Sequence, residues 1–193
     1  MAKPTTIYQL KVTLKHVKPA VWRRLQVPCE ITMAKLHSVL QDALGWTNSH
    51  LHQFVIGERR IGMKGIDEFS DDLEDEKRIK LSRIAFEKLC FIYEYDFGDG
   101  WEHEVLVEKV LPAVDGVRYP TCIAGKRACP PEDCGGVGGY ERLLEIIADP
   151  KHEEHADMIE WLGRPFDPDA FDVIEVNDLI HPSRNRRGTW VLA

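Results

Sequence analysis

The sequence lacks any apolar run that approaches the roughly 18 residues required for a membrane span. Its first six residues also lack the apolar core of a secretory signal peptide. The five cysteines are odd in number and irregular in spacing, which does not fit a disulfide framework. These absences predict a cytoplasmic protein that does not bind membranes and whose cysteines are free thiols.

Common catalytic signatures are missing as well. The chain has no Gly-Lys-Ser/Thr phosphate loop, no Gly-x-Gly-x-x-Gly fingerprint and no His-Glu-x-x-His metal motif. The letters Asp96-Phe97-Gly98 occur in protein kinases, but the glycine-rich strand pair, the strand lysine and the His-Arg-Asp loop of that fold are absent. At 193 residues the chain is also too short for a kinase, so no motif of this kind names a reaction.

Negative charge is confined to one segment. The net charge is −7, but residues 67–76 hold seven acidic residues and no basic one. Without that segment, 25 acidic and 25 basic residues remain, so the body of the protein is neutral and its charge neither predicts nor excludes a polyanionic partner. We expect 62–80 to be a solvated, mobile loop or hairpin tip; the alternative is an acidic segment that binds a cation or a partner.

Hydrophobic periodicity predicts a mixed fold. Alternating residues indicate strands over 6–16, 21–27 and 50–56, whereas 33–44 has a helical stripe between a Thr32 cap and Gly45. A long hairpin over 90–111 and helices near 140–148, 155–162 and 173–180 follow. We predict one α+β domain over 1–193, with a mainly antiparallel sheet, helices packed on it, a helical C-terminal part and a basic tail at 182–193. The tryptophans expected in its core are Trp22, Trp46, Trp101 and Trp161.

The hairpin carries polar chemistry. Apolar and polar residues alternate on both sides of Asp99-Gly100, the dipeptide suited to a two-residue type I′ turn. With that turn, Asp96 lies directly across from His103 on a face that also carries Glu94. The sequence therefore predicts a candidate polar site at Glu94, Asp96, Asp99 and His103.

Two further histidines extend this site. His50 and His52 lie two residues apart on an extended segment and share a face, and we expect one of them to approach the Asp96 and His103 face. Imidazoles and carboxylates can bind zinc, manganese or iron, and an open position would hold a water of lowered pKa. One interpretation is a divalent metal such as zinc at His50, His52, Asp96 and His103. The other is a structural hydrogen bond from a half-buried His103 to Asp96.

A connection rich in proline, glycine and cysteine spans 112–139 and leads into a helix. Glycines allow close backbone approach, and free amides at a helix N-terminus beside two basic residues could hold an anion. The candidate is therefore either an ordered structural loop or a ligand-binding loop that uses Lys126, Arg127, Glu132, Asp133, Gly135 and Gly136. Three nearby cysteines lack Cys-x-x-Cys spacing, so free thiols are favoured over a zinc site at Cys122, Cys129 and Cys134.

Ordered motifs cover nearly the whole chain, among them Trp22-Arg23-Arg24, Leu44-Gly45-Trp46, His50-Leu51-His52-Gln53-Phe54, Tyr95-Asp96-Phe97-Gly98-Asp99 and Cys129-Pro130-Pro131-Glu132-Asp133-Cys134-Gly135-Gly136. In these motifs the chain resembles the plasmid pRi ORF-3-like family, whose members are also labelled passenger TnpR proteins of insertion elements. The resemblance implies a single α+β domain without an accepted activity, so no catalytic role is carried onto any residue. It also hints at mobile-element biology, although the chain shows no feature of a serine resolvase.

Two function classes follow. The first is an uncharacterised cytoplasmic binding or accessory protein associated with mobile genetic elements; the alternative is a metal-dependent hydrolase that uses the His and Asp cluster. Basic residues occur as scattered pairs on a neutral body, so we expect nucleic-acid binding to be weak or absent. Any contact would be salt-labile and would involve Lys126, Arg127 and the tail residues Arg184, Arg186 and Arg187.

Overall fold

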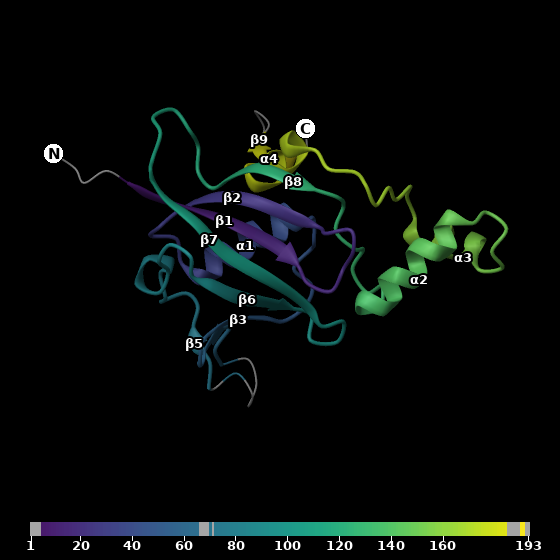
Figure 1. The fold of residues 1–193 in the computed structure, drawn as a ribbon, viewed down its shortest axis with the longest axis horizontal. Coiled ribbons are helices and arrows are strands. Elements are labelled where there is room, and N and C mark those ends of the chain that lie inside the picture. The colour runs from purple at the N-terminus through teal and green to yellow at the C-terminus, as the bar shows by residue number, and fades with distance from the viewer. Residues whose placement is uncertain (1–4, 66–69, 71, 185–189, 192–193) are drawn as a thin grey trace.

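The computed structural model describes residues 5–65, 70, 72–184 and 190–191, and it has an α+β fold (Figure 1). One sheet contains eight strands in the order β5-β4-β3-β6-β7-β1-β2-β8, and all its neighbours pair antiparallel except β4 and β5. The strand bounds are β1 (Thr6–Leu14), β2 (Trp22–Pro28), β3 (His52–Ile56), β4 (Arg59–Gly62), β5 (Glu74–Asp75), β6 (Cys90–Tyr95), β7 (Trp101–Pro112) and β8 (Thr121–Lys126). The predicted α+β class with a mainly antiparallel sheet is confirmed.

Helix α1 (Met33–Leu44) covers one face of this sheet. Its first turn is capped by the Thr32 hydroxyl, which accepts a hydrogen bond from the backbone amide of Lys35 at 3.2 Å. Gly45 ends the helix with a φ of +83°, a left-handed conformation that glycine adopts without a Cβ penalty. Both boundaries agree with those predicted from the sequence because every cue is local.

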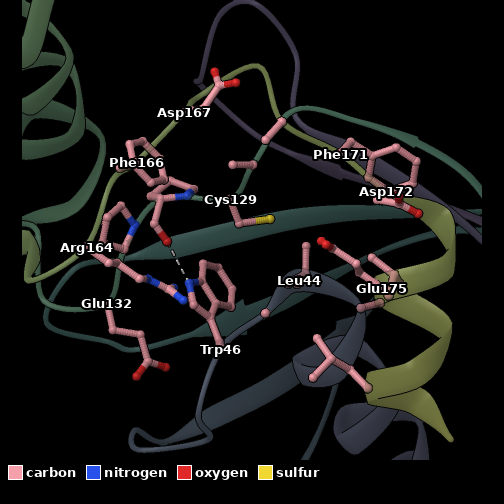
Figure 2. A pocket seen from close by; sticks show the side chains of 18 of the residues that line it. Leu44, Trp46, Cys129, Glu132, Arg164, Phe166, Asp167, Phe171, Asp172 and Glu175 are labelled. Carbon is pink, nitrogen blue, oxygen red and sulfur yellow. Dashed lines mark hydrogen bonds between the residues drawn. The ribbon is translucent and has the colours of Figure 1, made fainter. Parts of the chain in front are cut away.

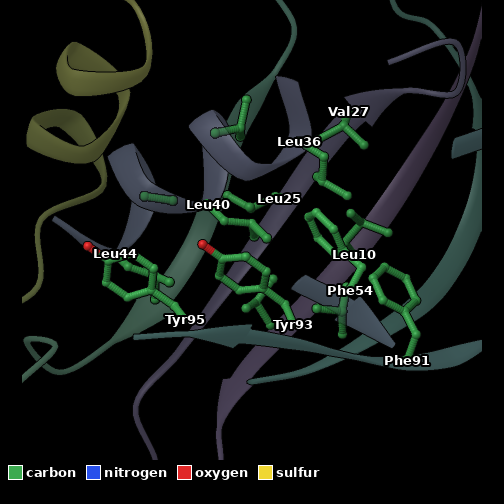
Figure 3. Close-up of a cluster of buried hydrophobic side chains, with 14 of the residues drawn as sticks. Leu10, Leu25, Val27, Leu36, Leu40, Leu44, Phe54, Phe91, Tyr93 and Tyr95 are labelled. Carbon is green, nitrogen blue, oxygen red and sulfur yellow. The ribbon is translucent and has the colours of Figure 1, made fainter. Parts of the chain in front are cut away.

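The core lies between α1 and the sheet (Figure 3). Leucines of the helix, Leu36 and Leu40 among them, pack over Phe54 and Tyr93, and all four side chains are fully buried. Burial of a large apolar side chain of this kind stabilises a fold by about 1.5–3 kcal/mol. The Tyr93 hydroxyl faces α1, where it accepts a hydrogen bond from the Gln41 side-chain amide at 2.9 Å.

The remaining helices lie at the periphery of the sheet. Helices α2 (Gly136–Ala148) and α3 (His155–Leu162) pack against each other beyond the tip of the β6–β7 hairpin (Figure 1). Helix α4 (Val173–Ile180) packs on α1 and β8. There is also a 3-10 turn, η2 (Leu81–Arg83), and a pair of short strands, β9 (Ser183–Arg184) and β10 (Trp190–Val191). No helix in the described part of the chain is long and apolar enough to cross a membrane.

Three expectations about these segments need correction. Strand β8 lies inside the stretch that we expected to be an irregular connection. The second half of 62–80 is folded against the sheet rather than solvated, since it contributes β5 and buries Leu73 and Glu76. Trp161, which we expected in the core, is 49% exposed, and the helix that carries it, α3, has no buried residue. Residues 66–69, 71, 185–189 and 192–193, which include most of the predicted basic tail, lie outside the described residues.

Candidate functional site

The hairpin register differs from the prediction. His103 pairs with Tyr93, Glu102 with Glu94 and Trp101 with Tyr95, so Asp96 lies in the loop and is not across from His103. The loop runs over 96–100, and it is not a two-residue type I′ turn because φ is positive at Asp96 and Gly100 but not at Asp99. The predicted pairing of Asp96 with His103 is therefore wrong: the partner of His103 is Tyr93, three residues before Asp96 in the chain.

The physical reason is the carboxylate of Asp96. Its Oδ1 accepts hydrogen bonds from the backbone amides of Gly98 at 3.0 Å and Asp99 at 3.3 Å, an Asx turn that closes the loop early. The Asp96 carbonyl oxygen accepts another from the Gly100 amide at 2.6 Å. These hydrogen bonds require a left-handed φ of +55° at Asp96, a conformation that Asp tolerates better than most residues.

With this register, His103 belongs to the core. It is fully buried, its Nδ1 lies 3.2 Å from the Tyr93 carbonyl oxygen, and its ring stands edge-on to Trp46 at 5.1 Å. Burial lowers the pKa of His103 to about 4, so the ring is neutral at physiological pH. Glu94, which we expected beside it, points to the other face and accepts a hydrogen bond from the Gln53 amide.

His52 is also occupied elsewhere. Its Nε2 lies 2.6 Å from a carboxylate oxygen of Glu76, and both side chains are almost completely buried. Its ring is stacked on His37 with centroids 3.4 Å apart. Of the predicted metal set of His50, His52, Asp96 and His103, the structure thus brings together His50 and Asp96 and leaves out His52 and His103.

Asp133 completes the cluster that forms instead. His50 Nε2 lies 3.7 Å from Asp96 Oδ2 and 3.2 Å from Asp133 Oδ1. Among the described residues this is the one group of three His, Cys, Asp or Glu side chains whose potential ligand atoms all lie within 4.8 Å of one another. Its members come from the segment before β3, the β6–β7 loop and the connection between β8 and α2.

Backbone contacts fix the first two of these segments to each other. The amide of Asp96 donates a hydrogen bond of 2.9 Å to the carbonyl oxygen of Leu51, the residue after His50. Because Oδ1 of Asp96 is held by the loop amides, Oδ2 is the oxygen that faces His50. His50 is about a quarter exposed, and Asp133 is 70% exposed, so the cluster opens to solvent on the Asp133 side.

Tyr95 and Glu132 hold the third segment in place. The Tyr95 hydroxyl donates a 2.6 Å hydrogen bond to Glu132 and accepts one of 3.0 Å from the Ser49 amide. Glu132 also accepts hydrogen bonds from the amide and the hydroxyl of Thr47. Burial would raise the pKa of Glu132, but these hydrogen bonds outweigh it and leave that pKa below its ordinary value. The residues on either side of His50 and Asp133 are therefore tied together by an ionised carboxylate.

Two glycines of the candidate loop, Gly135 and Gly136, allow its backbone to lie against the β6–β7 loop at Asp99. The Gly135 amide donates a 3.2 Å hydrogen bond to Asp99 Oδ2. At Gly136, with a φ of +67°, an added Cβ would collide with the carbonyl oxygen of Asp99. These contacts place the start of α2 directly on the hairpin loop, and a carboxylate of the chain itself takes the place that we proposed for an anion.

Of the two basic residues in the proposed anion site, only Arg127 is already paired with another described residue. Arg127 is buried and forms an ion pair with Asp169, and Lys126 ends strand β8 with an exposed side chain. All five cysteines are free thiols, as predicted. Burial raises the pKa of Cys129 to about 11 and that of Cys134 to about 12, which keeps both thiols protonated and unreactive.

Asp133 is the residue that sequence reasoning placed in the wrong group. It stands in the candidate ligand loop, and its contact with His50 spans 83 positions of sequence, which no local pattern reveals. The acidic pair Glu132-Asp133 after a diproline was the available signal, because two carboxylates in a stiff loop are unfavourable for an anion and suitable for a cation.

Comparisons with known proteins place the chain in a family. The family model described as plasmid pRiA4b ORF-3-like protein matches residues 6–175. The chain belongs to this family. An uncharacterized protein, y4hQ, of Sinorhizobium fredii (strain NBRC 101917 / NGR234) is 42% identical over 178 residues, which cover 91% of each chain. The crystal structure of a protein of unknown function, MM3350 from Methanosarcina mazei Go1, superposes with a TM-score of 0.82 at 43% identity, covering 89% of this chain and 98% of that one.

The family relationship confirms the resemblance found in the sequence. It supplies no reaction, because the relatives are themselves described as uncharacterized or of unknown function.

Proposed function

We propose that the chain binds a divalent metal ion, such as zinc, at His50, Asp96 and Asp133, and that a water on this metal carries out hydrolysis. The observation that carries the proposal is the approach of two carboxylate oxygens, from separate segments, to His50 Nε2 at 3.2 and 3.7 Å. A tetrahedral zinc ion with bonds of about 2.0–2.2 Å separates its ligand atoms by about 3.3–3.6 Å. The two distances from His50 Nε2 lie within a few tenths of an ångström of that separation, and all three ligand atoms lie within 4.8 Å of one another.

The competing explanation is an ion pair, in which a protonated His50 bridges the two aspartates. An imidazolium N–H in such a pair would point at one of the oxygens, yet His50 Nε2 is buried and makes no hydrogen bond with either. A nitrogen that lies 3.2 and 3.7 Å from two carboxylate oxygens without a hydrogen bond to either is better placed for a shared cation than for a donated proton. This orientation favours metal binding.

Three protein ligands and an open side are the arrangement of catalytic rather than structural zinc sites. A metal held in this way lowers the pKa of its bound water towards 7 and provides a nucleophile at neutral pH. The exposed side of Asp133 gives such a water access to solvent and to a substrate. The ligand set thus supports the hydrolase reading over a purely structural ion.

Metal binding is tested by titrating the EDTA-treated, dialysed protein with zinc in competition with a chromophoric chelator. We expect one zinc per chain. The substitutions His50→Gln and Asp133→Asn should each weaken zinc affinity by at least about 100-fold, since loss of even an outer partner costs 10–100-fold. Asp115→Asn, at an exposed residue of the β7–β8 loop, is the matched control and should change nothing. Equal affinity in Asp133→Asn and the control would refute the site.

Hydrolysis is tested separately on a panel of carboxylic and phosphoric esters. Turnover by the zinc-loaded protein that is lost in Asp133→Asn supports the hydrolase. Stoichiometric zinc without turnover on the panel would instead favour the binding or accessory role. We also propose an association with mobile genetic elements. This proposal rests on the family description and does not depend on the metal site.

A further inference from the structure

A cleft of about 610 Å³ lies beside the metal cluster, between the end of α1, the 128–132 segment and the stretch from α3 to α4 (Figure 2). Its volume is within the range of about 300–1,000 Å³ that small-molecule sites occupy. Among the residues that line this cleft, Glu132 lies at one end, and Asp172 and Glu175, at the start of α4, lie at the other (Figure 2).

Aromatic rings line the cleft. Trp46 lies between its two ends and is fixed by a 2.9 Å hydrogen bond from its Nε1 to the carbonyl oxygen of Pro130 (Figure 2). Phe166 and Phe171 add two further rings, and Trp161 adds a fourth. Trp161 is half exposed on a helix that buries none of its residues, so the stability of the fold does not explain this tryptophan.

The charge of the lining is negative. Two arginines line the cleft against five carboxylate side chains, which belong to Asp42, Glu132, Asp167, Asp172 and Glu175. One of the arginines, Arg23, is 3% exposed and directs its N–H groups at backbone carbonyl oxygens, including that of Ala43 at 2.8 Å, while its guanidinium lies over Phe171. Its donors are therefore used within the protein.

Asp42 and Glu175 are the carboxylates that remain available. Neither forms a hydrogen bond or an ion pair with another described residue, whereas Glu132 and Asp172 accept hydrogen bonds within the protein. Burial raises the pKa of Asp42, and the weaker attraction of Lys35 and His181 does not offset this loss of water. A cationic ligand in the cleft would add a direct partner for this carboxylate.

We propose that this cleft binds an organic cation, an amine or a guanidinium carried on an apolar or aromatic body. The positive group interacts with the carboxylates of Asp42 and Glu175, and the body packs on Trp46 and Trp161. An ammonium or guanidinium over an aromatic face gains further electrostatic attraction from the ring. The cleft thereby selects against anions of the same shape.

The chain connects the cleft to the metal cluster on both sides. Glu132 lines the cleft and precedes Asp133, while Trp46 and Thr47 line it and lead into His50. A molecule bound in the cleft would therefore lie next to the proposed metal. The inference does not depend on that metal, because none of the cluster residues lines the cleft.

The test uses the full chain with EDTA present, so that its outcome is separate from that of metal binding. Benzylamine, benzyl alcohol and benzoate, a matched cation, neutral molecule and anion, are titrated while tryptophan fluorescence and amide chemical shifts are recorded. Benzylamine should bind at least about 10-fold more tightly than either of the others. Tighter or equal binding of benzoate or benzyl alcohol, or no saturable binding of benzylamine, would overturn the proposal.

Variants locate the binding site. Asp42→Asn and Glu175→Gln keep side-chain size and should each weaken benzylamine binding several-fold, and Trp161→Ala should do so without loss of folding because Trp161 is exposed. Glu141→Gln, at an exposed position of α2 away from the cleft, is the charge-matched control. Benzylamine affinity that responds to Glu141→Gln as strongly as to Asp42→Asn would show non-specific attraction to an acidic protein and would also overturn the proposal.

Discussion

Lowering the pH from 7 to 5 should destabilise the protein through His103, the histidine that the fold removes completely from water. Its ring is enclosed by the core, with Tyr93 and Trp46 against it, and its Nε2 has no hydrogen-bond partner among the described residues. Protonation of this ring would place an unpaired charge in the core. The folded protein therefore resists a proton that the unfolded chain accepts.

The magnitude follows from the two pKa values. Burial lowers the pKa of His103 from 6.5 to about 4 in the folded protein. Between these values the unfolded state binds more protons, so stability is intact above pH 6.5 and falls as the pH falls towards 4. At 1.36 kcal/mol per pKa unit, the complete loss is about 3 kcal/mol, and about 2 kcal/mol of it occurs by pH 5. His37, whose pKa is also lowered to about 4, mainly by burial and then by His52, adds a similar loss.

Urea unfolding at pH 7 and pH 5 measures this loss. The variant His103→Leu removes the titrating group at similar volume, so its stability should fall between the two pH values by about 2 kcal/mol less than that of the wild type. His16→Asn, at an exposed histidine with left-handed backbone, is the control and should keep the full acid sensitivity. If His103→Leu loses as much stability as the wild type, His103 is not buried as a neutral ring and the core described above is incorrect.

Two substitutions test how the metal cluster is assembled. Gly136→Ala should destabilise the protein by at least about 1–2 kcal/mol, because it combines a positive φ with a collision against the Asp99 backbone, whereas Gly138→Ala in the same helix meets nothing and should be neutral or stabilising. Thermal unfolding compares the two, and equal stabilities would contradict the docking of α2 on the hairpin loop. Tyr95→Phe removes the hydroxyl that joins Glu132 to the Ser49 amide and should lower zinc affinity about 10-fold, as read by chelator competition. Unchanged zinc affinity would mean that Tyr95 does not position Asp133.

The sequence predicts best those elements whose cues are local. Helix α1 carries its cap, its apolar stripe and its terminal glycine within 14 consecutive residues, and the structure agrees at each end. Strand β8 has no such signal, because its place at the edge of the sheet comes from pairing with β2 and from Asn177 of α4, which hydrogen-bonds to the backbone of Cys122. Pairing partners far apart in sequence are not visible in a single segment.

The candidate site was predicted in part for the same reason. The sequence predicts that His50 or His52 approaches the Asp96 and His103 face, and in the structure His50 Nε2 lies 3.7 Å from Asp96 Oδ2. The hairpin register was wrong because the turn preference of Asp99-Gly100 is weaker than the two hydrogen bonds that the Asp96 carboxylate makes to the loop amides. Asp133 joined the cluster only through tertiary contacts made by Glu132, Gly135 and Gly136.

We propose that His50, Asp96 and Asp133 together hold one divalent metal ion. Anomalous diffraction at the zinc absorption edge, from crystals grown with zinc, tests it most directly. We predict a single strong peak about 2.0–2.2 Å from His50 Nε2 and from one carboxylate oxygen of each aspartate, with a water at a further position. A zinc peak elsewhere, or His50 bridging the two carboxylates without a peak between them in zinc-saturated crystals, would contradict it.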